Sequence, residues 1–260
     1  MRLRFLGVRG STPVSGVEFA RVGGHTSCLA VSVGDEPPSL VLDAGTGLQE
    51  LRADFGDRSF DGSILLTHLH WDHVQGLPFL PAIDRDDARV VLAQPAQGDP
   101  RQVLRRAMSP PHFPIPPEGL RGAWTHLALE PGKHQFGAFE VLARDVVHKG
   151  GRTFGYRVRS GDSTFAYVPD ALDANDDVIL ELAADAEVLV RGAPFVNDES
   201  ERATAFGHGT AEVAAAIARR ARVRQLVLTH HAPTRTDAAV HDIAARVGAT
   251  AATEGMTIVL

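Results

Sequence analysis

The chain has 260 residues, of which 44% are hydrophobic and 22% charged, and its formal net charge is −6. This composition is typical of a water-soluble globular protein that is large enough to bury a substantial core. The negative charge argues against stable binding to nucleic acid. No apolar stretch has the length of a membrane span or of a signal peptide, so we expect a cytoplasmic protein without membrane contact.

The first part of the chain is predicted to alternate strands with glycine-rich loops. Strands are expected at 2–7, 27–33 and 39–42, and a helix around 48–55. The run Gly7–Pro13 matches neither nucleotide-binding glycine fingerprint, which favours a tight loop at the rim of a site. Two interpretations of Asp43, at the end of the third strand, stay open. It could orient a metal-bound histidine, or it could stabilise the turn.

A dense group of potential metal ligands follows the apolar run Ile64–Leu66, which is predicted to be a buried strand. His68 and His70 can turn toward a common point beyond the strand, while Asp72 and His73 begin the next helix. Histidines also cap helices and fill cores. Three of them with a carboxylate at this spacing, however, need many polar partners to be buried. The spacing therefore predicts a metal site.

The middle of the chain combines a proline-rich loop with several predicted strands. After a short helix at 74–79 and a strand at 88–93, the prolines of residues 109–117 exclude helix and inner strand. This loop either walls a pocket with His112 and Phe113 or connects elements on the surface. Strands are expected at 136–142, 153–159 and 164–168. His148 and Asp170 lie just beyond predicted strand ends.

The last part of the chain repeats the layout of residues 64–68. A strand at 187–190 leads through Arg191 and Gly192 into an acidic loop, and Thr210 is a good N-cap for the next helix. A strand at 225–228 ends in Thr229-His230-His231. A helix at 237–247 and a strand at 256–260 close the chain. Because no linker or repeat is visible, we expect one domain spanning residues 1–260.

Ligand-type side chains thus follow four well-separated predicted strands. In layered α/β proteins the loops at strand ends converge over one site. The candidate ligands are His68, His70, Asp72, His73, His148, Asp170 and His230. Seven ligands exceed the need of one tetrahedral ion and suit two divalent ions with a bridging carboxylate. Ligation by His and Asp without thiolate favours zinc, with manganese, iron or nickel as alternatives.

The pattern His-x-His-x-Asp-His followed by distant His, Asp and His resembles the metallo-β-lactamase-fold hydrolases, from residue 5 to the C-terminus. Shorter motifs resemble the phosphodiesterase branch, which includes ribonuclease Z and the phosphoribosyl 1,2-cyclic phosphate phosphodiesterases. They are Gly-Val-Arg-Gly-Ser-Thr-Pro, Gly-Gly-His-Thr-Ser-Cys, Gly-Leu-Pro-Phe, His-x-Gly-Gly-x-x-x-Gly-Tyr and Gly-His-x-Thr. The resemblance implies an α/β (α+β) fold, a four-layer αβ/βα sandwich with the site at one edge between two mixed sheets.

The resemblance also implies a role for each site residue. It assigns His68, His70 and His148 to one ion. It assigns Asp72, His73 and His230 to the other, with Asp170 bridging the two. A hydroxide shared by the ions would attack phosphorus, and Asp72 would also orient this nucleophile. His208 would stabilise or protonate the leaving oxygen, unless it is only a histidine at a helix N-terminus. His231 matches no ligand and is expected beside the ligands or facing solvent.

Two positions depart from the family pattern. Where relatives usually have an acid that could orient His208, this chain has Arg191-Gly192. Asp198 or Glu199 could replace the acid, or Arg191 could bind the substrate phosphate directly. Lys149 stands where proline is common and is expected to place a cation near the substrate.

The leading hypothesis is a dinuclear metal-dependent hydrolase, a phosphodiesterase acting on a small cyclic or nucleotide-like phosphodiester. Processing of transfer RNA is disfavoured, because the chain has no long basic arm and its net charge is negative. One alternative is hydrolysis of a carboxylic ester, lactone or thioester. Another is a metal-binding homologue with weak or no hydrolytic activity. A homo-oligomer is compatible with the sequence.

Overall fold

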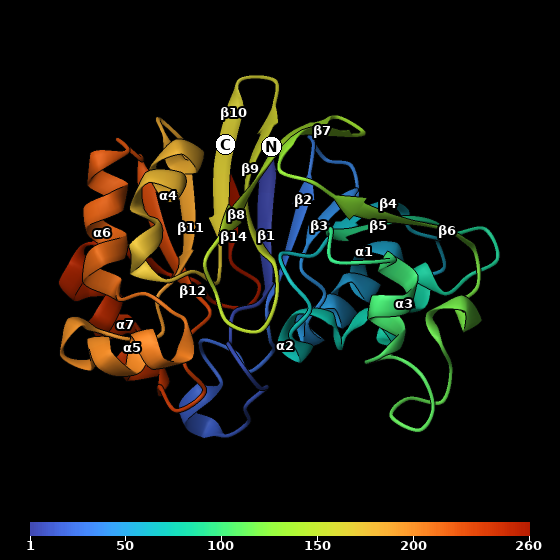
Figure 1. The fold of residues 1–260 in the computed structure, drawn as a ribbon, viewed down its shortest axis with the longest axis horizontal. Helices are drawn as coiled ribbons and strands as arrows, with labels where there is room; N and C mark the ends of the chain where they lie inside the picture. The colour runs from blue at the N-terminus through green and yellow to red at the C-terminus, as the bar shows by residue number, and fades with distance from the viewer.

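The computed structural model describes residues 1–260, apart from the side chain of Asn175. Two seven-stranded sheets face each other, and helices cover their outer sides (Figure 1). The strand order is β14-β1-β2-β3-β4-β5-β6 in the first sheet and β13-β12-β11-β10-β9-β8-β7 in the second. Each sheet has an antiparallel half and a parallel half. This arrangement confirms the predicted fold class.

The first six strands of the chain and the last one form the first sheet, and the strands between them in the chain form the second sheet. The first sheet contains β1 (Arg2–Gly7), β2 (Cys28–Ser32), β3 (Leu40–Leu42), β4 (Asp61–Leu65), β5 (Arg89–Pro95), β6 (Ala123–Leu129) and β14 (Thr257–Val259). The second contains β7 (Gly132–Phe136), β8 (Phe139–Val146), β9 (Thr153–Ser160), β10 (Ser163–Val168), β11 (Val188–Gly192), β12 (Gln225–Thr229) and β13 (Thr250–Ala251). The first sheet is covered by α1 (Arg52–Phe55), α2 (Trp71–Val74) and α3 (Pro100–Arg105) (Figure 1). The second is covered by α4 (Asp176–Ala183), α5 (Ser200–Phe206), α6 (Ala211–Arg220) and α7 (Asp237–Val247).

Apolar residues that alternate along the strands form the core between the sheets. Phe5 and Leu29 of the first sheet and Tyr156 and Val190 of the second belong to one buried cluster. A second cluster, which includes Leu48 and Phe60, packs the helices onto the outside of the first sheet. Burial on this scale holds the strand ends in fixed positions, because close-packed interiors deform little.

The structure differs from the sequence prediction in several places. The helix predicted at 74–79 is absent, since α2 ends at Val74 and a 3-10 helix spans Leu77–Phe79. The strand predicted at 136–142 is a hairpin of β7 and β8, whose turn contains Gly137 with a φ of 54°, a left-handed value that favours glycine. The helix predicted at 48–55 is mostly a 3-10 helix, Thr46–Leu51, followed by the single turn of α1. The acidic loop predicted after Arg191 contains α5. Helix α7, by contrast, coincides with the prediction.

The parallel halves of both sheets bring several strand ends to one edge of the molecule. Strands β3, β4 and β5 are parallel in the first sheet, as are β10, β11 and β12 in the second. The loop after β1 joins this edge, because Arg9 forms bridges with both Thr26 and His231. Among the described helices, none combines the length and the apolar character that a membrane span requires.

Candidate metal centre

The segment after β4 presents four polar side chains toward the interior. The start of the segment is held by Thr67, the residue before His68. Its backbone N–H and its hydroxyl donate to Asp43 Oδ1 over 2.7 and 2.9 Å. His70 is extended and precedes α2, whose single turn contains Asp72 and His73. His68, Asp72 and His73 are buried, and His70 is half-buried. The predicted placement of these residues, two before the helix and two inside it, is confirmed.

The second sheet supplies the other candidate ligands one at a time. His148 lies two residues beyond β8, Asp170 two residues beyond β10, and His230 directly after β12. The Asp170 side chain is 1% exposed. Gly10 of the loop after β1 packs against the His230 imidazole so closely that a Cβ at Gly10 would lie 2.3 Å from it. A glycine is therefore required where this loop crosses the site.

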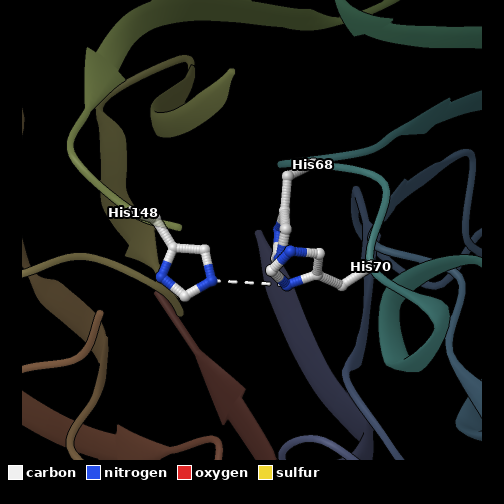
Figure 2. A group of neighbouring side chains, drawn as sticks. All are labelled: His68, His70 and His148. Carbon is white, nitrogen blue, oxygen red and sulfur yellow. Dashed lines mark hydrogen bonds between the residues drawn. The ribbon is translucent and has the colours of Figure 1, made fainter. Parts of the chain in front are cut away.

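The seven side chains meet in two groups of three, with Asp170 beside both. In the first group His68, His70 and His148 point toward one another, and His148 Nε2 lies 3.3 Å from His70 Nδ1 (Figure 2). In the second group Asp72 Oδ2 lies 3.3 Å from His73 Nε2 and 3.1 Å from His230 Nε2. Within each group the potential ligand atoms are all within 4.8 Å of one another.

Asp170 contacts members of both groups. Its Oδ2 lies 2.8 Å from His73 Nε2 and 3.6 Å from His68 Nε2. Its Oδ1 lies 3.3 Å from His230 Nε2 and 3.1 Å from His208 Nδ1. One carboxylate thus contacts His68 of the first group and His73 and His230 of the second.

The inward-facing atoms lack the hydrogen bonds that buried polar groups normally have. Within the described part of the chain, His68 Nε2 is buried and has no hydrogen-bond partner, and both buried oxygens of Asp170 face only imidazole nitrogens. Such atoms are rare in folded proteins and call for an explanation, of which an ion is one. The donor set of imidazole nitrogens and carboxylate oxygens suits zinc. The His/Asp cluster is consistent with a dinuclear metal site, and its residues fit one.

Local electrostatics favour the forms that bind metal. Burial lowers the pKa of His68 and of His70, and it lowers the pKa of His148 to about 4. Burial alone would raise the pKa of Asp170, but His230 and His73 hold that pKa well below its usual range. Neutral imidazoles and ionised carboxylates are the forms that coordinate metals.

His73 is the exception, because its pKa is raised. Burial would lower it, but Asp72, Asp43 and Asp170 surround the ring and together raise it well above its usual value. Three carboxylates around one imidazole leave an excess of negative charge that a bound cation would offset. This crowding of negative charge around one imidazole is a second sign that the pocket suits a cation.

Asp43 orients His73 from behind. Its Oδ2 accepts from His73 Nδ1 over 2.8 Å and from the Tyr167 hydroxyl over 3.0 Å. These contacts keep the proton on Nδ1 and direct Nε2 into the cluster, as carboxylate partners of metal-binding histidines do. Of the two interpretations of Asp43, the structure supports the orienting one.

The loop after β1 contributes a contact that the sequence analysis missed. The Ser11 backbone N–H donates to Asp72 Oδ2 over 2.7 Å. The loop is held by the fully buried Arg9, whose guanidinium donates to Gly23 O and Arg235 O, both over 2.7 Å, and pairs with Asp237. The sequence feature that could have indicated an ordered loop here is Arg9 within a glycine-rich run, because a buried arginine needs many hydrogen-bond partners.

His208 lies next to the cluster in the turn between α5 and α6. Its ring centroid is 5.0 Å from that of His148 and 5.1 Å from that of His230. Thr210 caps α6 as predicted, accepting from the Val213 backbone N–H over 3.4 Å. Helix α6 therefore begins next to the candidate ligands, and His208 shares a carboxylate with them.

The missing acid at position 192 has a steric cause. A Cβ at Gly192 would lie 1.6 Å from Pro169 O, so this backbone excludes any side chain there. Asp170 provides a carboxylate to His208 instead. The suggestion that Glu199 substitutes is wrong, because Glu199 Oε2 accepts from the Val196 N–H and pairs with Arg235. Asp198, on the same short 3-10 helix, is exposed.

The prediction that Arg191 binds substrate is contradicted by its burial. The side chain is 1% exposed, and it donates to Gly192 O over 3.0 Å and to Ala171 O over 2.8 Å. A guanidinium enclosed in this way ties the ends of β10 and β11 together and cannot meet a substrate phosphate. Lys149 is exposed, and its ammonium donates to Ala205 O of α5 beside the site. Its proposed contact with substrate stays a prediction.

His231 is neither solvent-facing nor beside the ligand atoms. It is buried, and its Nε2 donates to Ala252 O over 3.0 Å. Its backbone N–H donates to Val8 O, and its carbonyl accepts from Gly10. Burial lowers the pKa of His231 to about 3. This histidine therefore anchors the loop after β1 rather than facing water.

A family model described as the beta-lactamase superfamily domain matches residues 40–231. Ribonuclease Z of Haloferax volcanii is 28% identical over 88% of this chain and 84% of that protein. Ribonuclease Z of Bradyrhizobium diazoefficiens is 29% identical over 94% of each chain.

Solved structures share the fold at lower identity. The metallo-beta-lactamase fold protein YhfI from Bacillus subtilis superposes with a TM-score of 0.78, at 19% identity over 99% of both chains. Zn²⁺-bound PqqB from Methylobacterium extorquens superposes with a TM-score of 0.74, at 20% identity over the full length of both chains. At these identities the likeness concerns the fold alone.

Proposed function

The chain belongs to the beta-lactamase superfamily and has the His/Asp cluster of a metal-dependent hydrolase, and from this premise we propose that it is a dinuclear phosphodiesterase. Its substrate would be a small cyclic or nucleotide-like phosphodiester. The observation that carries the proposal is the meeting of seven side chains in two groups that share Asp170. Relatives named ribonuclease Z, which cover most of the chain, favour a phosphodiester over other esters.

Each group would hold one ion. His68, His70 and His148 would bind the first, and Asp72, His73 and His230 the second, with Asp170 bridging. The unpartnered His68 Nε2 and the position of both Asp170 oxygens among imidazole nitrogens support this assignment. Zinc is the first expectation because the ligands are histidine and aspartate without thiolate, and manganese, iron or nickel are alternatives. The shared fold of Zn²⁺-bound PqqB agrees with zinc.

The chemistry divides between the ions and the chain. Two divalent ions would act as Lewis acids on the phosphoryl oxygens and would supply an acidified water as nucleophile. Asp72, held by the Ser11 amide, would accept a hydrogen bond from that nucleophile and orient it. His208 would donate a proton to the leaving oxygen from Nε2, since Asp170 lies at its Nδ1.

The proposed substrate is a small molecule, and stable binding of nucleic acid is not expected. The formal net charge of −6 would repel an extended phosphate backbone. Lys149, the exposed residue that follows His148, would supply a cation for the phosphodiester group at the rim of the site.

Metal analysis followed by a substrate panel tests the proposal. The purified protein should hold two equivalents of metal and hydrolyse bis(p-nitrophenyl) phosphate and at least one cyclic diester. His208→Ala should keep both equivalents and lose about a hundredfold or more of the turnover number, as expected when a general acid is removed.

Two outcomes would contradict the proposal. Metal-loaded protein that hydrolyses lactones or thioesters but no phosphodiester would assign a different substrate class. Metal-loaded protein inactive on every ester would assign a metal-binding homologue. If His208→Ala leaves diester turnover intact, the role of His208 in the reaction is wrong.

A further inference from the structure

A cavity of about 300 Å³ lies against α2, next to the segment that carries the candidate ligands. Helical spacing puts Trp71, Val74 and Gln75 on one face of this turn and Asp72 with His73 on the other. The first three residues line the cavity, and the last two belong to the cluster. One helical turn thus separates the two sites.

Aromatic side chains form the walls of this cavity. Trp71 is 75% exposed and Phe79 is 59% exposed, which is unusual for side chains of this size. Phe113 of the proline-rich loop packs edge-on against Phe79, with centroids 5.9 Å apart and an interplanar angle of 89°. Buried Leu104 and Met108 form the floor. The loop at 109–117 therefore walls a pocket, which settles the choice that the sequence left open.

The lining carries almost no charge. Among the described residues that line the cavity, none has a carboxylate, an ammonium or a guanidinium. The lining contains one histidine, His112. The other polar side chain, Gln75, donates to Thr26 Oγ1 over 3.3 Å. Flat aromatic and thioether walls without charge favour an uncharged, planar occupant.

A second cavity lies beside the first and reaches Leu69, in the segment that carries His68 and His70. It has a volume of about 270 Å³, shares Trp71 and Val74 with the first, and adds Leu69 and Arg106. Leu69 stands between His68 and His70, two of the candidate ligands. Because Trp71 directly follows His70, a group bound against its side chain could remain attached to a phosphate held at the cluster, and Arg106 would lie beside that group.

We propose that the aromatic cavity binds a nucleobase, or an uncharged heterocycle of that size, attached to the phosphodiester that the metal centre hydrolyses. This inference deepens the proposed function, because it names the group carried by the phosphate. Bases stack on aromatic side chains with little dependence on their identity, so the cavity selects for a ring rather than for one base. The exposed Trp71 and Phe79 are the surfaces on which it stacks.

Tryptophan fluorescence of the metal-loaded protein tests binding without any need for activity. The chain has two tryptophans, Trp71 in the cavity wall and Trp124 on β6 outside it. In Trp124→Phe the remaining Trp71 should be quenched saturably by adenosine and unaffected by ribose. In Trp71→Phe the remaining Trp124 should not respond. Absence of saturable quenching in Trp124→Phe, or equal quenching in both variants, would overturn the proposal.

Kinetics separate this inference from the proposed function. Phe113→Ala should lower kcat/KM for 2′,3′-cyclic AMP roughly tenfold, mainly through KM, because one stacking wall is lost. The same variant should leave a cyclic phosphate of ribose without a base within twofold of wild type. If wild type prefers the base-free substrate, the cavity assignment fails while the phosphodiesterase proposal stands. If neither diester reacts but adenosine quenches Trp71, the phosphodiesterase proposal fails while the cavity assignment stands.

The competing occupant of an exposed aromatic surface is a second copy of the chain. Sedimentation of wild type and of Phe79→Ser over a range of concentrations decides this point. The proposal expects the two proteins to show the same mass. Dissociation of a wild-type dimer by Phe79→Ser would place the aromatic residues in a subunit interface and overturn the assignment.

Discussion

The two sheets supply the metal cluster in opposite ways. The first contributes four candidate ligands within residues 68–73, whereas the second contributes His148, Asp170 and His230 from three separate loops. The geometry of the first set is fixed by one strand end and one helical turn. The geometry of the second depends on the parallel order of β10, β11 and β12, which brings distant strand ends together. Local sequence spacing determines one half of the site, and long-range packing determines the other.

Asp170 is where the two halves meet, so changing it gives the largest expected effect. Asp170→Ala removes the carboxylate that contacts His73, His68 and His230 at once. We expect metal content to fall below two equivalents and diester turnover to fall at least roughly a thousandfold. Metal analysis and initial rates on the same preparation measure both quantities.

An exposed aspartate gives the matched control for this change. Asp177→Asn on α4 removes a charge of the same sign outside the cluster and should keep metal content and turnover at wild-type levels. If Asp170→Ala retains two equivalents of metal, the bridging role is wrong, and the two halves of the site bind their ions independently.

The difference between the two halves of the site also determines how much of it the sequence predicts. The His68–His73 segment is recognisable because all its ligands lie in one short run after an apolar strand. His148, Asp170 and His230 are recognisable as ligand-type residues beyond predicted strand ends, but their assignment to particular ions comes only from the resemblance to a family, because their proximity depends on sheet order. The steric exclusion at Gly192 by Pro169 O and the burial of Arg191 could not be predicted. Both depend on how closely neighbouring strand ends pack, and no sequence spacing encodes that distance.

The fold itself was predicted more completely than the loops. Strands β1, β10 and β12 and helix α7 follow from hydrophobic periodicity and capping residues. The hairpin of β7 and β8 was missed because its tight turn interrupts no apolar pattern. The contact of Ser11 with Asp72 was missed because it uses a backbone N–H, which every residue except proline has.

The orienting role of Asp43 gives the next largest effect, and it tests the first half of the site. Asp43→Asn replaces the acceptor of the His73 Nδ1 proton, so His73 loses the partner that directs Nε2 to the metal. We expect metal affinity to fall by about 10- to 100-fold. Competition with a chromogenic chelator measures the affinity.

Tyr167→Phe provides a control that removes another hydrogen bond of the same carboxylate. The Tyr167 hydroxyl donates to Asp43 Oδ2 but does not contact His73 Nε2. We expect this variant to change metal affinity by less than about threefold, since Asp43 keeps its bond to His73. Equal losses in the two variants would mean that burial of Asp43, rather than its bond to His73, controls the metal.

Lys149 should have a smaller effect, because its charge is exposed to solvent. It follows His148 of the second half of the site, and its side chain packs beside Gly207. Lys149→Ala should raise KM for an anionic diester by about threefold at low salt, and the difference should shrink as salt is added. Lys133→Ala on β7, the only other lysine, should leave KM unchanged. An unchanged KM in Lys149→Ala would remove this residue from the substrate site.

His230 and His231 extend the contrast to adjacent residues, because one faces the cluster and the other is enclosed by Val8 and Ala252. Burial lowers the pKa of His231 to about 3, against 6.5 for an ordinary histidine. The folded state therefore keeps His231 neutral where the unfolded chain binds a proton. Its contribution to stability is fully present above pH 6.5 and is lost as the pH falls toward 3.

This linkage predicts a change in acid stability with little change in activity. At about 1.4 kcal/mol per unit of pKa difference, protonation of His231 accounts for roughly 4 to 5 kcal/mol of the loss between pH 6.5 and 3. His231→Gln keeps a donor for Ala252 O but does not titrate, so its unfolding free energy should fall less steeply with acid. Denaturant unfolding of metal-free protein from pH 7 to pH 4 measures the slopes, because both proteins then share the titration of the ligand histidines. If the unfolding free energies of the two proteins fall equally steeply with acid, another buried group causes the loss of stability. His231 would then take up its proton in the folded state as readily as in the unfolded chain.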